Sequence, residues 1–433
     1  MRFTLRLSAL TCLALACVGA LLSASRSARA QTPAVQAGQV IISELRYRGP
    51  NGIRDEFIEL YNNTDSDIIV QAADATAGWA VFTSNGSITG PVCLIPNNTR
   101  IPARGHLLCA NTDPDFNSGY SLNGYPSGNP TPQPTPTPNF FAQTTPDRTF
   151  VIDDLPDGFG VALFKTQSST NLNSGTRLDS FGFTNSPELF KEGNGFPLIP
   201  TANNEHTLFR DLRPVTPLDS GNNATDFRFV ATTATLQTSL NGSPGPENLA
   251  SPIVNNNISS NVIDPAVGAA SPPNRVRIHT AETNAPQGTI LIRRLFTNNT
   301  GRPVSRLRFR VTNITTRGTP ASECGGSPCA DVRALTSQDE SVTLSNSTKV
   351  TVQGVRLEAD PPLTPEGGGL NASLSADFIT LAQPLADGAS VRIQFKLGVV
   401  QTGPFRFFVN IEAQNSPTAV VVTSPARVAS SKR

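Results

Sequence analysis

The chain has 433 residues, of which 38% are hydrophobic and only 15% charged, and its 34 Lys and Arg side chains nearly balance 33 Asp and Glu. This balance gives no whole-chain electrostatic reason to bind nucleic acid or anionic lipid. Long amphipathic stretches rich in Ala, Glu, Lys and Leu are absent, which excludes coiled coils and helical bundles, whereas 36 Pro and 33 Gly indicate many turns.

Residues 1–30 have the layout of a secretory signal peptide. Two arginines precede an apolar run over residues 7–22, and Ala28-Arg29-Ala30 forms a small-x-small cleavage site. The run is too short for a membrane helix, which needs about 20 apolar residues. Lipid attachment at Cys17 is the alternative, although Ala14 stands where a lipobox usually has Leu. We expect a secreted protein (extracellular, periplasmic or at the cell surface) without a transmembrane segment.

Short apolar runs separated by Gly, Pro, Asn and Asp clusters recur along the chain and predict an all-β fold. The first two runs, Val40–Tyr47 and Glu56–Tyr61, flank the turn sequence Gly49-Pro50-Asn51-Gly52. Facing strands could bring three carboxylates of these runs together, and such a cluster can perform acid–base chemistry or hold a metal. These carboxylates are Glu44, Glu56 and Glu59. We favour the ordinary interpretation, in which they are solvated or accept hydrogen bonds from turn amides.

Two of the six cysteines, Cys12 and Cys17, leave with the signal peptide. An even number remaining in an oxidising compartment predicts two disulfides. Their spacing pairs Cys93 with Cys109, and Cys324 with Cys329. A zinc site is the alternative, but the two pairs lie in different presumed domains and the chain has only three histidines.

The segment 128–146 is rich in Pro and Thr and is predicted to be a polyproline-like insertion. After it, three aspartates suggest a calcium loop: Asp153, Asp154 and Asp157. An EF-hand does not fit, because Leu155 and Phe164 occupy positions that need oxygen ligands. Irregular calcium binding stays an alternative to ordinary turn chemistry, and we expect no cofactor.

A Pro-, Asn- and Ser-rich stretch, 246–274, is predicted to be a flexible linker to a second domain at 275–415. Strict alternation in this domain, with Leu307, Phe309 and Val311 as one set, predicts strands with one buried face. About seven such strands are typical of an immunoglobulin-like sandwich. The last residues, 416–433, are predicted to form a disordered tail.

The alternate positions of the same strand carry three arginines, and these are our candidate ligand-binding residues: Arg306, Arg308 and Arg310. A cationic sheet face could bind an extracellular polysaccharide, a protein or another polyanion through its guanidinium groups. The simpler interpretation is a soluble outer face that discourages edge pairing. Both interpretations place these side chains in solvent.

Several segments between residues 36 and 245 together resemble a bacterial lamin-tail domain. They are Val40–Leu45, Glu56–Asn62, Gly78-Trp79, Ile101–Leu108, Asp157–Leu163, Leu178–Phe183, His206–Arg210 and Asn222–Phe227. The resemblance implies an immunoglobulin-like sandwich that acts as a binding or tethering module in secreted bacterial proteins. Within it, Trp79 is interpreted as core packing rather than as a carbohydrate platform.

Catalytic motifs are absent from the sequence. No Gly-x-Ser-x-Gly elbow, HExxH pattern, P-loop or dinucleotide fingerprint occurs. We therefore predict two immunoglobulin-like β-sandwich domains in a secreted, non-enzymatic binding or surface-associated protein, with no catalytic or metal-ligating residues. Two alternatives stay open: a metal-assisted extracellular hydrolase, or its accessory domain, using Glu44, Glu56 and Glu59; and a purely structural envelope protein.

Overall fold

The computed structural model describes residues 34–48, 56–84, 88–111, 146–150, 155, 158, 160–199, 206–214, 216–233, 239–358 and 364–416. The elements below belong to one compact unit, residues 37–433; residues 34–36, the described part of the other unit, contain no helix or strand. Several predicted features lie outside the described residues: the signal peptide, the turn at 49–52, residues 128–145, the tail beyond residue 416, and Asp153, Asp154 and Asp157.

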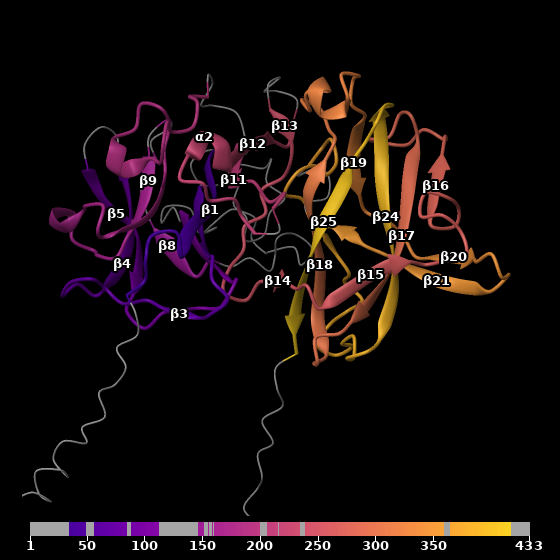
Figure 1. Ribbon diagram of the computed structural model, residues 1–433, viewed down its shortest axis with the longest axis horizontal. Helices are drawn as coiled ribbons and strands as arrows, with labels where there is room; N and C mark the ends of the chain where they lie inside the picture. The colour runs from indigo at the N-terminus through magenta and orange to yellow at the C-terminus, as the bar shows by residue number, and fades with distance from the viewer. Residues whose placement is uncertain are drawn as a thin grey trace, which may run out of the picture. The chain divides into compact units, whose positions relative to one another are not determined.

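The fold is nearly all β, as predicted, and its first half contains a seven-stranded and a four-stranded sheet (Figure 1). The larger sheet has the spatial order β13 (Leu240–Asn241), β12 (Phe227–Ala231), β11 (His206–Arg210), β1 (Val40–Arg48), β2 (Phe57–Asn62), β7 (His106–Asn111), β8 (Arg148–Phe150). The smaller sheet has the order β10 (Arg177–Phe181), β9 (Gly160–Phe164), β4 (Gly78–Ser84), β5 (Ile88–Pro96). Minor elements are β3 (Ile68–Ile69) paired with β6 (Arg100–Ile101), η2 (Ser169–Asn171), η3 (Glu188–Phe190) and α2 (Asn223–Asp226).

Two links join these sheets across their core. The disulfide Cys93–Cys109 connects β5 with β7, and both sulfur-bearing residues are fully buried. The guanidinium of Arg210 on β11 reaches Asp179 on β10, with Nη2 2.8 Å from a carboxylate oxygen. Trp79 is also fully buried, and its indole N–H donates to the carbonyl of Gln71 at 2.7 Å, as expected for a packing residue. The disulfide and the ion pair between Arg210 and Asp179 therefore fix how the two sheets face each other.

The second half contains a five-stranded and a seven-stranded sheet. The five-stranded sheet has the order β14 (Ile253–Val254), β25 (Phe407–Asn415), β18 (Val304–Ile314), β23 (Ser373–Ser375), β22 (Arg356–Leu357). The other has the order β15 (Ile258–Val262), β17 (Thr289–Asn298), β24 (Ser390–Gln401), β21 (Lys349–Gly354), β20 (Glu340–Thr343), with β16 (Arg275–Ile278) beside β17 and β19 (Asp331–Leu335) beside β24. The short helix η4 (Ala321–Cys324) precedes the second disulfide, Cys324–Cys329.

Aromatic rings from both sheets fill the core between them. Phe309 of β18 lies with its ring centroid 5.0 Å from that of Phe395 on β24 and 4.8 Å from that of Phe296 on β17. The predicted alternation of β24 is confirmed on this side, because Ile393, Phe395 and Leu397 are all buried. Both predicted disulfides are present as well.

The segment 246–274 is not the structureless linker that its composition predicted. Its strand β14 pairs with β25, and its strand β15 pairs with β17 over the whole range Ile258–Val262. Glu247 at its beginning is 3% exposed. Polar composition was misleading here because ladder hydrogen bonds use the backbone, which Asn and Ser supply as well as apolar residues do. Among the described residues, no helix has the length and apolar character needed to cross a membrane.

Candidate functional site

The candidate site begins with two glutamates that face each other on neighbouring strands. Glu44 of β1 is the cross-strand partner of Glu59 of β2, and β2 in turn places Tyr61 beside His106 of β7. Side chains alternate across a strand, so Glu59 and His106 share the face opposite to Ile58, which is paired with the core cysteine of β7. Two carboxylates directly opposite each other repel, so this face requires cations.

The cations come from β18. Arg308 and Arg310 are the cross-strand partners of Glu412 and Asn410 on β25. Nε of Arg308 donates to Oε2 of Glu412 at 2.6 Å, and Nε of Arg310 donates to Oε1 at 2.9 Å. Burial raises the pKa of Glu412, but both of its oxygens accept these charged donors.

The predicted exposure of these arginines is wrong. Arg308 and Arg310 are only 2% and 3% exposed. Arg306 is half-buried, and burial followed by the charge of Arg308 lowers its pKa. Alternation identified correctly which side chains leave the core, but it carries no information about a second layer that covers the other face of the strand.

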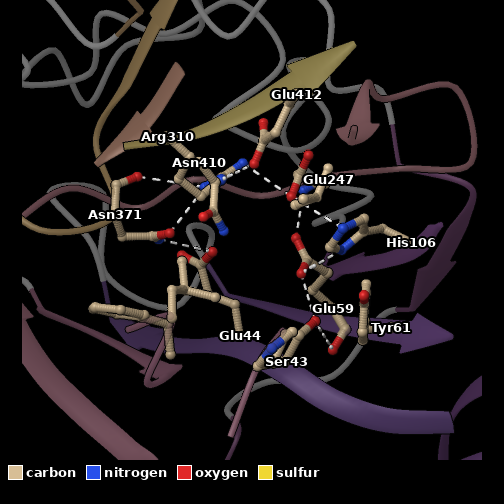
Figure 2. A pocket seen from close by; sticks show the side chains of 14 residues that line it. Ser43, Glu44, Glu59, Tyr61, His106, Glu247, Arg310, Asn371, Asn410 and Glu412 are labelled. Carbon is tan, nitrogen blue, oxygen red and sulfur yellow. Dashed lines mark hydrogen bonds and ion pairs between the residues drawn. The ribbon is translucent and has the colours of Figure 1, made fainter. Parts of the chain in front are cut away.

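Glu247 joins the glutamate face of β2 to the arginines of β18, and Figure 2 shows it beside Arg310 and His106. Its Oε1 accepts from Arg308, and Nη2 of Arg310 lies 3.0 Å from its Oε2. Its backbone N–H donates to Oε2 of Glu59 at 2.6 Å. Although burial alone would raise its pKa, the charges of Arg310, His106 and Arg308 lower the pKa of Glu247 to about 2.

His106 lies between two carboxylates. Its Nδ1 is 2.9 Å from Oε1 of Glu59, and its Nε2 is 3.1 Å from Oε2 of Glu247. Only the doubly protonated imidazolium can donate from both nitrogens. Burial lowers the pKa of His106, but the carboxylates of Glu247 and Glu59 outweigh it and the net shift is upward. The ring therefore acts as a further cation of the cluster.

Glu44 differs from the other carboxyl groups, because no cation of the described part of the chain lies at contact distance from it. The amide of Gly245 donates to its Oε1 at 2.9 Å, and Nδ2 of Asn371 donates to its Oε2 at 3.0 Å. Burial, and then the charge of Glu59, raises the pKa of Glu44 to about 8, so this group is mostly protonated at neutral pH. The remaining carboxylates and cations are equal in number: Glu59, Glu247, Glu358 and Glu412 face Arg306, Arg308, Arg310 and His106.

A divalent cation does not fit this balance. Glu59, His106 and Glu247 offer ligand atoms within 4.8 Å of one another, which is a metal-like spacing. However, both oxygens of Glu247 are already contacted by guanidinium groups. An added ion would place two further positive charges beside two buried arginines in a cluster that is already neutral. These residues form an ion-pair network rather than a metal centre.

A second group of acids has the same character. Asp179, Glu192 and Asp219 also have metal-like spacing, but Arg210 lies between them. This guanidinium is fully buried, and its Nη1 lies 3.2 Å from Asp226 as well. Burial, and then the charge of Asp179, raises the pKa of Glu192 to about 8. These acids balance the charge of Arg210, which connects the first two sheets.

The three glutamates of the alternative hydrolase site do not all meet. Glu44 and Glu59 line the same cavity, whereas Glu56 accepts hydrogen bonds from Asn111 Nδ2 and from the amide of Leu155, each at 2.8 Å. The shared cavity measures about 30 Å³, which is the space of one water molecule. This volume does not admit an organic substrate.

Two central residues, His106 and Glu247, were not identified from the sequence. His106 had a usable signal, because it lies in Ile101–Leu108, one of the segments singled out in the sequence. Glu247 had none, since it lies in a polar Gly-Pro segment outside any apolar run.

No protein-family model matches this sequence, and a comparison with curated proteins finds no match either. The fold and the site therefore define the class: an all-β protein with two disulfides and a buried, charge-balanced ion-pair network between its sheets.

Proposed function

We propose that this chain is a secreted, non-enzymatic binding or surface-associated protein, built from a lamin-tail-like sandwich and a second immunoglobulin-like sandwich. The observation that carries the proposal is that the two acids most suggestive of catalysis already have partners within the protein. Glu44 and Glu59 are committed to a neutral network with Arg308 and Arg310. A hydrolase would need such groups free and open to substrate.

Two further features support this proposal. The segments that resemble a lamin-tail domain coincide with strands, among them β1, β2 and β11. Two disulfides suit an oxidising compartment, which agrees with export directed by residues 1–30. A protein of this kind recognises its ligand through loops and sheet edges carried by a rigid scaffold.

Fractionation of producing cells tests the location. We expect the exported chain to begin at Gln31 and to be found in the medium or in a gentle wash of intact cells. A structural envelope protein would instead stay in the pellet after washing. Retention of residues 1–30 on a cytoplasmic product would contradict the proposal.

Incubation of the purified chain with isolated envelope material and with a glycan and nucleic-acid array tests the activity. We expect retention of the chain on at least one of these, unchanged by EDTA and without breakdown of the retained material. Breakdown that EDTA abolishes would favour the metal-assisted hydrolase and overturn the proposal.

A further inference from the structure

The second pair of sheets contains a cavity of about 550 Å³ that is separate from the ion-pair network. Its walls come from β16, β17, β19, β24 and the turn before β25, all in the right-hand half of Figure 1. Its lining includes Arg275, Ile290, Val332, Val399 and Phe405. Sites for small ligands typically have volumes of about 300–1,000 Å³, so this cavity has the right size.

The charge of this cavity is positive and uncompensated. Among the residues that the structure describes, no acidic side chain lines it, and Arg275 forms no ion pair. The guanidinium of Arg275 lies 5.9 Å from the ring centroid of Phe405. Arg294, whose strand neighbours that of Arg275, also has no ion pair within the described ranges. Arg277 differs, because it donates to the carbonyls of Ile278, Thr289 and Gln287.

The floor of the cavity is apolar. Ile290 is 7% exposed and Val399 is 3% exposed, and the half-buried Phe405 adds further apolar surface, whereas Val332, at 0%, has no surface open to a ligand. Among the described residues that line the cavity, Thr402 has the only uncharged polar side chain. A sugar would need several side-chain donors and acceptors, which this lining does not provide. A cation above an aliphatic floor instead suits a molecule with one anionic end and an apolar chain.

The rim is held in place by the second disulfide. The disulfide closes the loop Cys324–Cys329, and the next residue, Ala330, lines the cavity and donates its N–H to the carbonyl of Pro404 at 2.9 Å. Nε2 of Gln401 donates to the carbonyl of Cys329 at 3.1 Å. A rim fixed in this way lowers the ordering cost of binding.

We propose that this cavity binds a single-chain amphiphilic carboxylate, a fatty-acid-like anion, with its carboxylate at Arg275 and its chain against Ile290, Val399 and Phe405. The inference rests on the proposed binding function and supplies a site and a ligand class for it. It involves none of the residues of the ion-pair network.

Calorimetric titration of the exported chain with decanoate tests the inference. We expect saturable binding of one decanoate, weakened on the order of tenfold or more by Arg275→Gln, since a charged hydrogen bond is lost. Arg302→Gln, at an exposed position of the same pair of sheets, is the matched control and should bind as the wild type does. Acetate, which lacks the chain, and decyltrimethylammonium, which has the opposite charge, should not bind measurably.

A second variant makes the test independent of Arg275. Ala270→Trp changes an exposed residue of the lining and should obstruct the cavity without disturbing the core. Decanoate that binds equally to the wild type, Arg275→Gln and Ala270→Trp, or not at all to the wild type, would overturn the inference. If Arg275→Gln lost decanoate yet kept envelope binding, the proposed function would stand on another surface. If the wild type bound decanoate but not the envelope material or the array, the proposed function would be refuted and the decanoate site would stand.

Discussion

At the scale of single residues, the pKa values of Glu44 and His106 are both raised, for different reasons. Glu44 binds its proton because desolvation penalises the carboxylate, whereas His106 binds its proton because two carboxylates face it. A group that binds a proton more tightly in the folded state contributes to the stability of the protein at low pH. This contribution is lost as the pH rises from the group's unfolded pKa to its folded pKa. For Glu44 that window runs from 4.5 to about 8. For His106 it begins at 6.5 and extends upward.

We therefore predict that Glu44→Gln flattens the pH dependence of stability between about pH 5 and pH 8. Glutamine is neutral throughout, so the variant should be more stable than the wild type at pH 8, where the wild type begins to hold a buried charge. Urea unfolding at several pH values measures this difference. Glu188→Gln, at a side chain that is 88% exposed, is the control and should change stability by less than about 0.5 kcal/mol. Parallel curves for wild type and Glu44→Gln would contradict the prediction.

At the scale of elements, β14 and β15 convert a predicted linker into part of the second pair of sheets. The amides of β15 that face β17 are ladder donors, and the amide of Glu247 donates to Glu59. We predict that hydrogen exchange over residues 247–262 is slowed to the level of β17. Mass spectrometry of peptides from both segments measures this, with the exposed segment 279–281, which lies outside the strands, as the fast reference. Rapid exchange throughout 247–262, beside a protected β17, would restore the linker interpretation.

The two disulfides should differ in their effect on stability. Cys93–Cys109 closes 16 residues and joins two sheets, whereas Cys324–Cys329 closes only 5 residues. Loop-closure entropy gives about 3 kcal/mol for a loop near 15 residues and less for a shorter one. We predict that replacing the first pair by alanine lowers the free energy of unfolding by about this amount, and more than replacing the second pair does. Denaturant unfolding of both double variants measures the difference, and equal losses would count against it.

The sequence predicted the strands well because alternation and turn residues act locally. The buried rows of β18 and β24 were identified from their spacing, and spacing paired the cysteines correctly. The polar rows were misjudged for a physical reason: period-two alternation separates two faces of a strand but does not say whether water or protein covers the second. Arg308 and Arg310 lie under Glu247, whose approach depends on chain far outside β18. Likewise, the sequence suggested that facing strands could bring Glu44 and Glu59 together, but it gave no indication of the cations beside them.

At the scale of the whole molecule, the ion-pair network connects strands from both halves of the chain. Glu59 and His106 come from the first two-sheet assembly, and Arg308, Arg310 and Glu412 from the second, with Glu247 in contact with both sets. Such a buried network gains little over apolar packing, but removing one partner is costly because the others stay buried and unpaired. Cooperative unfolding of the two halves should therefore depend on Glu247.

We predict that Glu247→Ala costs about 3–5 kcal/mol and divides a single calorimetric unfolding transition into two. The variant leaves the cluster with an excess positive charge from Arg308, Arg310 and protonated His106, which weakens the contact between the halves more than it weakens either core. Glu282→Ala is the matched control, since it removes a partner of Lys396 at a side chain that is 40% exposed and should cost at most about 1 kcal/mol.

The contribution of Glu247 to the stability of the wild type should be present above pH 4.5 and disappear as the pH falls towards 2, because the pKa of Glu247 is lowered in the folded state. Differential scanning calorimetry at pH 6 and at pH 3 measures both effects. Two transitions already present in the wild type at pH 6 would show that the network does not couple the halves.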